Sequence, residues 1–336
     1  MKAAIYGEDK RLVVREIPDP TPGPDEIVMQ VSYCAICGSD LHRYAYGMSS
    51  AGTIMGHEFS GVVVATGKEV TAWHVGDRVT RAGGRIDPGR DLPNFPPRFS
   101  AKERGFLPAK PGAYAEYLAT PAEKVMATPE GVSDLEASLV EPVTVAVHTV
   151  RASKLKLGDA AVVLGAGPIG LFTEQCARLA GANRLYVSET SPARRGVAEI
   201  LGADAVFDPG SMDLVKEVVA RTGIGADVAF ECAGARPTLQ QALELVRMGG
   251  QVVVVSLAWE PVDCRPVDWV GREVELKTVY AHLNSDWPIA MDLVARGAVE
   301  TKPLISKVVG LDHIDEAFQE LLDPENELVQ VVVQCN

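Results

Sequence analysis

The chain has little cysteine, no long apolar run and no cluster of basic residues. Its 336 residues include only six cysteines, which are too sparse for a disulfide-stapled fold and are typical of a reducing cytoplasm. No stretch of about 18 apolar residues is present, so we expect no helix that spans a membrane. The segment from Met1 to Leu12 carries charges without an apolar core, so we also expect no signal peptide.

Acidic residues outnumber basic ones. The chain has 32 lysines and arginines against 45 aspartates and glutamates, which gives a net charge of −13 at pH 7. Because no basic stripe offsets this charge, phosphate backbones would be repelled, and we expect no nucleic-acid partner. These exclusions favour a soluble, acidic, intracellular globular protein.

The length predicts two domains, since single hydrophobic cores rarely grow beyond about 250–300 residues. Short alternating segments separated by turns predict a β-rich first domain, with strands at 3–6 and 26–33. From residue 160 the order changes to strand (160–164), glycine turn, helix (171–179) and strand (184–188), which is typical of a parallel, doubly wound sheet. The tail ends in a further strand at 329–333.

The glycine turn is Gly165-x-Gly167-x-x-Gly170, and it follows a strand and opens a helix. Such a turn lets the backbone approach a pyrophosphate, which then lies at the helix N-terminus. Glu189 ends the next strand, where a carboxylate binds the adenosine ribose hydroxyls and repels a 2′-phosphate. The pattern therefore predicts NAD rather than NADP, although Arg194 and Arg195 lie nearby. We assign the cofactor site to Gly165, Gly167, Pro168, Ile169, Gly170, Glu189, Arg194 and Ser256. The alternatives are a tight structural turn and, for Glu189, a solvated helix start.

A second group of polar residues lies between positions 37 and 58. Cys37-Gly38-Ser39-Asp40-Leu41-His42 opens it, and Gly56-His57-Glu58 closes it. Zinc binds sulfur, imidazole nitrogen and carboxylate oxygen together, and a catalytic site keeps one position open. Cys34 also lies near Cys37, but no second pair of cysteines completes a four-sulfur site, so we interpret Cys34 as a small buried residue.

These two stretches, with Gly61, Gly67 and Glu141-Pro142, resemble the zinc-containing medium-chain alcohol dehydrogenases. Glu141-Pro142 is similar to the polyol branch of that family, which includes the sorbitol, 2,3-butanediol and threonine dehydrogenases. The resemblance implies an α/β architecture of two domains. A GroES-like, β-rich catalytic domain would comprise 1–143 and 284–336, and a Rossmann dinucleotide-binding domain would comprise 144–283.

The resemblance also implies roles for single residues. Cys37 and His57 would bind zinc, with Glu58 and Glu141 as further ligands, directly or through water. Asp40 would orient His57, while Ser39 and His42 would carry the substrate proton; the alternative for Ser39 and Asp40 is helix capping. The implied reaction is reversible, NAD-dependent oxidation of a secondary alcohol, a polyol or vicinal diol, in a dimeric or tetrameric enzyme.

One departure from the family concerns the stretch 81–112, which is rich in glycine and proline. Most bacterial relatives carry four closely spaced cysteines near residues 85–110 for a structural zinc, and this chain has none there. We therefore expect a single, catalytic zinc and no structural one. Two alternatives stay open: a zinc-free quinone or enone reductase of the same fold, and a non-catalytic sensor that binds NAD(H) or zinc.

Overall fold

The computed structural model describes residues 1–84 and 112–336, which form two compact units. The first unit comprises Met1–Glu141, Leu283–Ala295 and Ile305–Asn336, and the second comprises Pro142–His282 and Arg296–Leu304. The glycine- and proline-rich loop expected at 81–112 lies, apart from its ends, outside the described residues.

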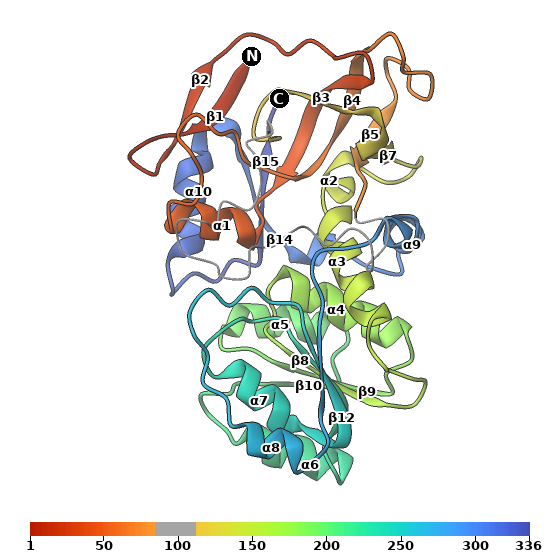
Figure 1. Ribbon diagram of the computed structural model, residues 1–336, viewed down its shortest axis with the longest axis vertical. Coiled ribbons are helices and arrows are strands. Elements are labelled where there is room, and N and C mark those ends of the chain that lie inside the picture. Colours follow the sequence, from red (N-terminus) through yellow and green to blue (C-terminus); the bar gives the residue numbers. More distant parts are fainter. Residues whose placement is uncertain (85–111) are drawn as a thin grey trace. The chain divides into compact units, whose positions relative to one another are not determined.

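The first unit is built on a seven-stranded sheet in the order β14-β15-β3-β4-β5-β7, with β6 also paired to β3 (Figure 1). A separate antiparallel pair is formed by β1 and β2. The strands are β1 Lys2–Tyr6, β2 Leu12–Glu16, β3 Glu26–Ala35, β4 Glu58–Thr66, β5 Arg78–Arg81, β6 Tyr117–Pro121, β7 Val125–Ala127, β14 Ile305–Gly310 and β15 Gln330–Gln334. β3 contacts β15, β4 and β6, so it is the central strand of this unit.

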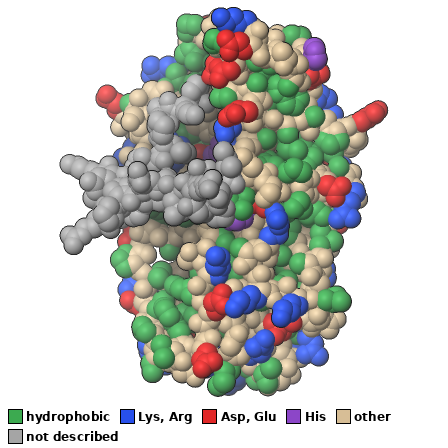
Figure 2. Space-filling model, turned by 45° about the vertical axis from the view of Figure 1, so that its right-hand side comes forward, with side chains coloured by type: hydrophobic (Ala, Val, Ile, Leu, Met, Phe, Trp, Pro, Cys, Tyr) green, Lys and Arg blue, Asp and Glu red, His purple; other side chains and the backbone are tan. Residues whose placement is uncertain are grey.

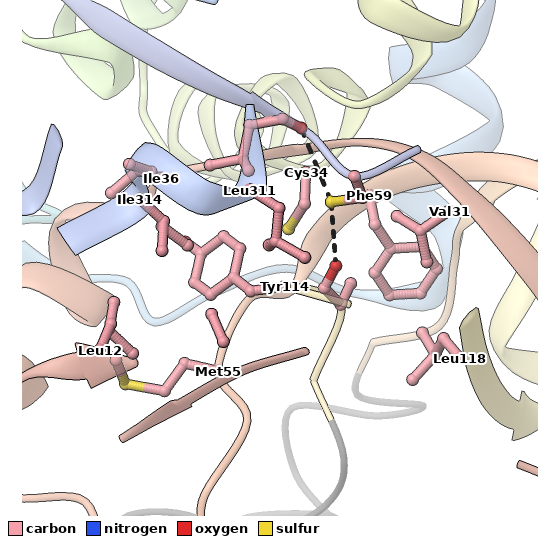
Figure 3. Close-up of a cluster of buried hydrophobic side chains, with 14 of the residues drawn as sticks. Leu12, Val31, Cys34, Ile36, Met55, Phe59, Tyr114, Leu118, Leu311 and Ile314 are labelled. Carbon is pink, nitrogen blue, oxygen red and sulfur yellow. Dashed lines mark hydrogen bonds between the residues drawn. The ribbon is translucent and has the colours of Figure 1, made fainter. Parts of the chain in front are cut away.

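Among the described residues, four helices lie wholly in this unit, and a fifth begins at Val140 and continues into the second unit. They are α1 Gly38–Ala45, α2 Asp134–Ala137, α9 Trp287–Ala295, α10 Ile314–Leu322 and, at the border, α3 Val140–Arg151. Pro142 is the third residue of α3, where a helix tolerates proline because the first N–H groups have no intrahelical acceptor. Buried side chains from the strands and from α10, among them Val31, Phe59 and Ile314, form the core shown in Figure 3.

The second unit contains a parallel six-stranded sheet in the order β10-β9-β8-β11-β12-β13. The strands are β8 Ala160–Leu164, β9 Arg184–Ser188, β10 Ala205–Phe207, β11 Ala226–Glu231, β12 Val246–Val254 and β13 Glu275–Thr278. The helices between them are α4 Pro168–Leu179, α5 Pro192–Ile200, α6 Leu214–Thr222, α7 Thr238–Leu245 and α8 Pro266–Val270. From β8 the chain runs outward to β10, and from β11 it runs the other way to β13. Right-handed crossovers therefore place α4 and α5 on one face, and α6 and α7 on the other.

Two features of this unit differ from the sequence-based ranges. Helix α4 begins at Pro168 rather than at 171, because Gly167 is its N-cap and proline suits the first helical position. The segment 284–336 was expected to lie wholly in the first unit, but its residues Arg296–Leu304 belong to the second unit. There the side chain of Gln175 accepts from the backbone N–H of Glu300 at 2.7 Å and donates to its carbonyl at 3.1 Å.

The short 3₁₀ turns are η1 Ala122–Lys124, η2 Asn284–Asp286, η3 Lys302–Leu304 and η4 Leu311–His313. Within 1–84 and 112–336, every helix is too short or too polar to cross a bilayer. On the face in view in Figure 2, acidic and basic side chains are interspersed with apolar ones and form no basic stripe.

Candidate active site

The pairing of β3 with β4 brings the two halves of the polar motif together. Ala35, the last residue of β3, is paired with Glu58, the first residue of β4. Residues just after β3 therefore meet residues at the start of β4. This places Cys37, which directly precedes α1, beside His57 and Glu58.

Cys37, His57 and Glu58 each contribute one ligand-type atom, and these atoms lie within 4.8 Å of one another. It is the one such group found in the part of the chain that the structure describes. Glu58 is 2% exposed, and its Oε2 has no hydrogen-bond partner among the described residues. A buried carboxylate with an unpartnered oxygen, on a residue that lies beside a thiol and an imidazole, fits a divalent cation that prefers mixed sulfur, nitrogen and oxygen ligands.

Burial acts on both acidic members of this group. It raises the pKa of Glu58 to about 8, with a further contribution from the negative charge of Glu141. Burial and the charge of Glu58 raise the pKa of the Cys37 thiol to about 11. A bound cation would reverse both effects, because it stabilises the thiolate and the carboxylate that ligate it.

Asp40 is fully buried on α1, and its Oδ2 lies 3.5 Å from Nδ1 of His57. The hydroxyl of Tyr114 donates to the same oxygen at 2.9 Å. Although burial opposes ionisation of Asp40, the charge of His57 and these hydrogen bonds lower its pKa. Burial likewise opposes protonation of His57, but the neighbouring Asp40 and Cys37 raise its pKa well above the ordinary value. Asp40 thus pairs with Nδ1 of His57, so that Nε2 of the same imidazole is the nitrogen that could ligate a metal.

Ser39 and Asp40 do not act as helix caps. The N-cap of α1 is Cys37, and it makes no side-chain capping bond. The hydroxyl of Ser39 instead donates to Sγ of Cys37 at 3.3 Å. Both side chains are therefore directed at the ligand group rather than at the end of the helix.

The remaining site residues of the first unit lie on α1 and α3. His42 stacks on Tyr46 with ring centroids 6.1 Å apart, and burial lowers its pKa, which favours the neutral form that accepts a proton. Glu141 lies in the first turn of α3 and is 7% exposed. It is not one of the three converging ligands, and its effect on the group is through its charge on Glu58.

The predicted cofactor residues lie in the second unit, most of them in the turn between β8 and α4 and at the start of α4. At Gly170 a Cβ atom would lie 1.8 Å from the carbonyl oxygen of Gly165, so only glycine fits. Glu189 is buried rather than solvated, and its Oε2 accepts from the backbone N–H of Ala166 within the turn at 2.7 Å. The carboxylate is therefore hydrogen-bonded directly to the glycine turn.

Ser256 and Arg194 have contacts of their own. Ser256 donates its hydroxyl to the carboxylate of Glu231, which also accepts from the backbone of Gly234 at 2.8 Å and from Thr238 at 2.7 Å. Arg194 lies in the first turn of α5, and its N–H donates to Ser191. No role was assigned to Glu231 from the sequence. The feature that could have identified it is a carboxylate at the end of an apolar strand.

Comparisons with known proteins identify the family of this chain. Residues 23–130 match the family described as alcohol dehydrogenase GroES-like domain, and residues 168–296 match zinc-binding dehydrogenase. Two curated relatives from Bacillus subtilis (strain 168) are similar along the whole chain. (R,R)-butanediol dehydrogenase is 35% identical, covering 100% of both chains, and sorbitol dehydrogenase is 31% identical, covering 100% of this chain and 98% of its own.

The fold is also similar to a solved structure from Sinorhizobium meliloti 1021, described as a zinc-binding dehydrogenase and bound to NADP. Its TM-score is 0.85 at 31% identity, covering 99% of this chain and 98% of its own. The predicted architecture, a GroES-like domain with a Rossmann domain, is confirmed. Sequence, fold and the converging Cys37, His57 and Glu58 lead to one conclusion. The chain belongs to the zinc-containing medium-chain alcohol dehydrogenases, in their polyol branch.

Proposed function

We propose that the chain binds one zinc ion at Cys37, His57 and Glu58 and oxidises a secondary alcohol reversibly with NAD. The observation that carries this proposal is the convergence of three ligand-type atoms within 4.8 Å, with a buried and unpartnered Oε2 on Glu58. The substrate class, a polyol or a vicinal diol, is taken from relatives that are named for butanediol and sorbitol. Zinc at this site supplies a Lewis acid for the substrate hydroxyl.

The chain's own residues would orient the site and accept the proton. Asp40 holds Nδ1 of His57, so that the imidazole presents its other nitrogen. Ser39 accepts the proton of the substrate hydroxyl and passes it toward His42, whose lowered pKa keeps it able to accept. Glu58 and Glu141 supply carboxylates that ligate directly or through water.

For the cofactor we propose NAD rather than NADP. Glu189 is buried against the glycine turn, where its charge opposes a 2′-phosphate. Its Oε1 also accepts from the backbone N–H of Ser191 at 2.8 Å, which fixes the carboxylate in place. Pro168, Ile169, Arg194 and Ser256 complete the proposed cofactor site. The proposal further includes a single zinc without a structural one, a homodimer or homotetramer, and a cytoplasmic location.

The test is turnover by the purified full chain. NAD and NADP are each offered with 2,3-butanediol stereoisomers, sorbitol, xylitol and simple secondary alcohols, and absorbance of the reduced nicotinamide is followed. We expect activity on a diol or polyol with NAD, and a loss of about 10²-fold in kcat for Ser39→Ala, the lower range for a proton-transfer group. Absence of turnover on the whole panel with both cofactors would contradict the proposal.

A further inference from the structure

Tyr114 is held by its backbone to the segment that leads into His57. The N–H groups of Ala113 and Tyr114 donate to the carbonyls of Gly56 and Met55, both at 3.0 Å. Gly112 donates to Ile54 at 2.9 Å in the same way. The segment that leads into His57 thus helps to set the position of Tyr114, together with β1, where the N–H of Ala4 donates to the carbonyl of Tyr114 at 2.8 Å.

The ring of Tyr114 is fully buried in the core of the first unit (Figure 3). It packs edge-on against Phe318, with centroids 5.8 Å apart and an interplanar angle of 88°. Gly56, with φ +95°, makes room for it, because a Cβ there would lie 2.9 Å from both Cδ1 of Tyr114 and Sγ of Cys34. These contacts fix the position of the ring and therefore the direction of its hydroxyl.

That hydroxyl reaches two acceptors. Oδ2 of Asp40 lies at 2.9 Å and the carbonyl oxygen of Ala35 at 3.2 Å. A hydroxyl has one proton to donate, and an ionised carboxylate at the shorter distance is the stronger acceptor. The other oxygen of Asp40, Oδ1, has no hydrogen-bond partner within the described ranges. Tyr114 is thus the one hydroxyl seen there to fix the rotation of this buried carboxylate.

We propose that Tyr114 is a positioning residue for the metal centre: its hydroxyl holds the Asp40 carboxylate, which in turn orients His57 toward the ion. The inference rests on the proposed zinc site. Without the hydroxyl, Asp40 can turn its oxygens away from Nδ1, and the imidazole loses the partner that fixes its tautomer and ring angle. Loss of a residue that hydrogen-bonds to a metal ligand weakens metal binding by about 10–100-fold. Because Tyr114 bonds to Asp40 and not to the ligand itself, we expect its loss to weaken zinc binding by about tenfold.

The experiment uses Tyr114→Phe in the full chain, which removes the hydroxyl and keeps the ring. Tyr44→Phe is the matched control. Tyr44 is also buried, also packs on Phe318 (5.2 Å between centroids), and donates to a carboxylate, Asp315 Oδ1, at 2.8 Å. The readouts are the zinc dissociation constant, by competition with a chromophoric chelator, and the visible absorption of the Co²⁺-substituted protein. Thermal unfolding of the metal-free chains accounts for any loss of fold stability.

We expect Tyr114→Phe to weaken zinc binding about tenfold and to change the Co²⁺ absorption bands, while Tyr44→Phe changes neither. A double-mutant cycle with Asp40→Asn then tests the order of action. If Tyr114 works through Asp40, its substitution has no further effect in the Asp40→Asn chain. Unchanged zinc affinity in Tyr114→Phe, or fully multiplicative effects in the cycle, would overturn the inference and leave the zinc site standing. A wild-type chain that binds no zinc would overturn both.

Discussion

Glu174 should make the unfolding free energy depend on pH. It lies on α4, which follows the predicted pyrophosphate turn, and it is fully buried. Neither carboxylate oxygen has a hydrogen-bond partner among residues 1–84 and 112–336. Arg178, one turn away, directs its guanidinium to Asp204 at 2.7 Å instead. Burial raises the pKa of Glu174 to about 8, although the charge of Arg178 and the backbone near Ala203 act in the opposite direction.

The sign and size of the effect follow from this pKa. Between pH 4.5 and about 8 the unfolded chain has lost the Glu174 proton while the folded chain keeps it. Because the unfolded state binds fewer protons, the unfolding free energy falls as pH rises through this window. At about 1.36 kcal/mol for each pH unit, the full destabilisation above pH 8 is about 5 kcal/mol. Most of it, about 4 kcal/mol, develops between pH 5 and 9.

Glu174→Gln removes the titrating group and keeps the shape of the protonated acid. Urea unfolding, followed by circular dichroism from pH 5 to 9, should show nearly equal stability at pH 5. The variant should then be the more stable by about 4 kcal/mol at pH 9. Glu199→Gln, at an exposed position on α5, controls for the loss of one negative charge. A difference between Glu174→Gln and wild type that is the same at all pH values would refute the reasoning.

Three further predictions concern the two sites. Asp40→Asn should weaken zinc binding by about 10–100-fold in the chelator competition, because a neutral amide orients His57 less firmly; an unchanged dissociation constant would exclude that role. Gly170→Ala should abolish NAD binding in calorimetry, since the new Cβ would lie 1.8 Å from the carbonyl of Gly165, and retained binding would contradict the proposed turn geometry. Glu189→Gln should raise the ratio of kcat/KM with NADP to that with NAD by about tenfold, equivalent to about 1.4 kcal/mol, and an unchanged ratio would show that Glu189 does not select the cofactor.

The sequence was most informative where the chemistry is local. The strands predicted at 160–164 and 184–188 are β8 and β9, because short apolar runs between turn signals have few other structures available. Cys37, His57 and Glu58 could be predicted together because a thiol, an imidazole and a carboxylate within 22 positions match zinc chemistry. The family and the two-domain architecture followed from those same motifs.

Contacts between distant positions could not be predicted in this way. Tyr114 and Asp40 are 74 positions apart, and long-range contacts such as the pairing of 112–114 with 54–56 bring them together. Glu174 occupies a helix position where a charged residue would ordinarily face solvent, so its burial has no local signal. Where Arg296–Leu304 returns to the second unit, Gln175 of α4 bonds to the backbone of Glu300, a contact that no periodicity reveals.

The central claim is that Cys37, His57 and Glu58 hold a single zinc ion. Elemental analysis of the full chain, purified without chelators, tests it most directly when paired with Cys37→Ser. The account predicts about one zinc per chain in the wild type, and little or none in the variant, with alcohol oxidation lost in parallel. Two zinc ions per chain would contradict the single-site proposal. Activity that persists in a wild-type chain without zinc would contradict the metal centre itself.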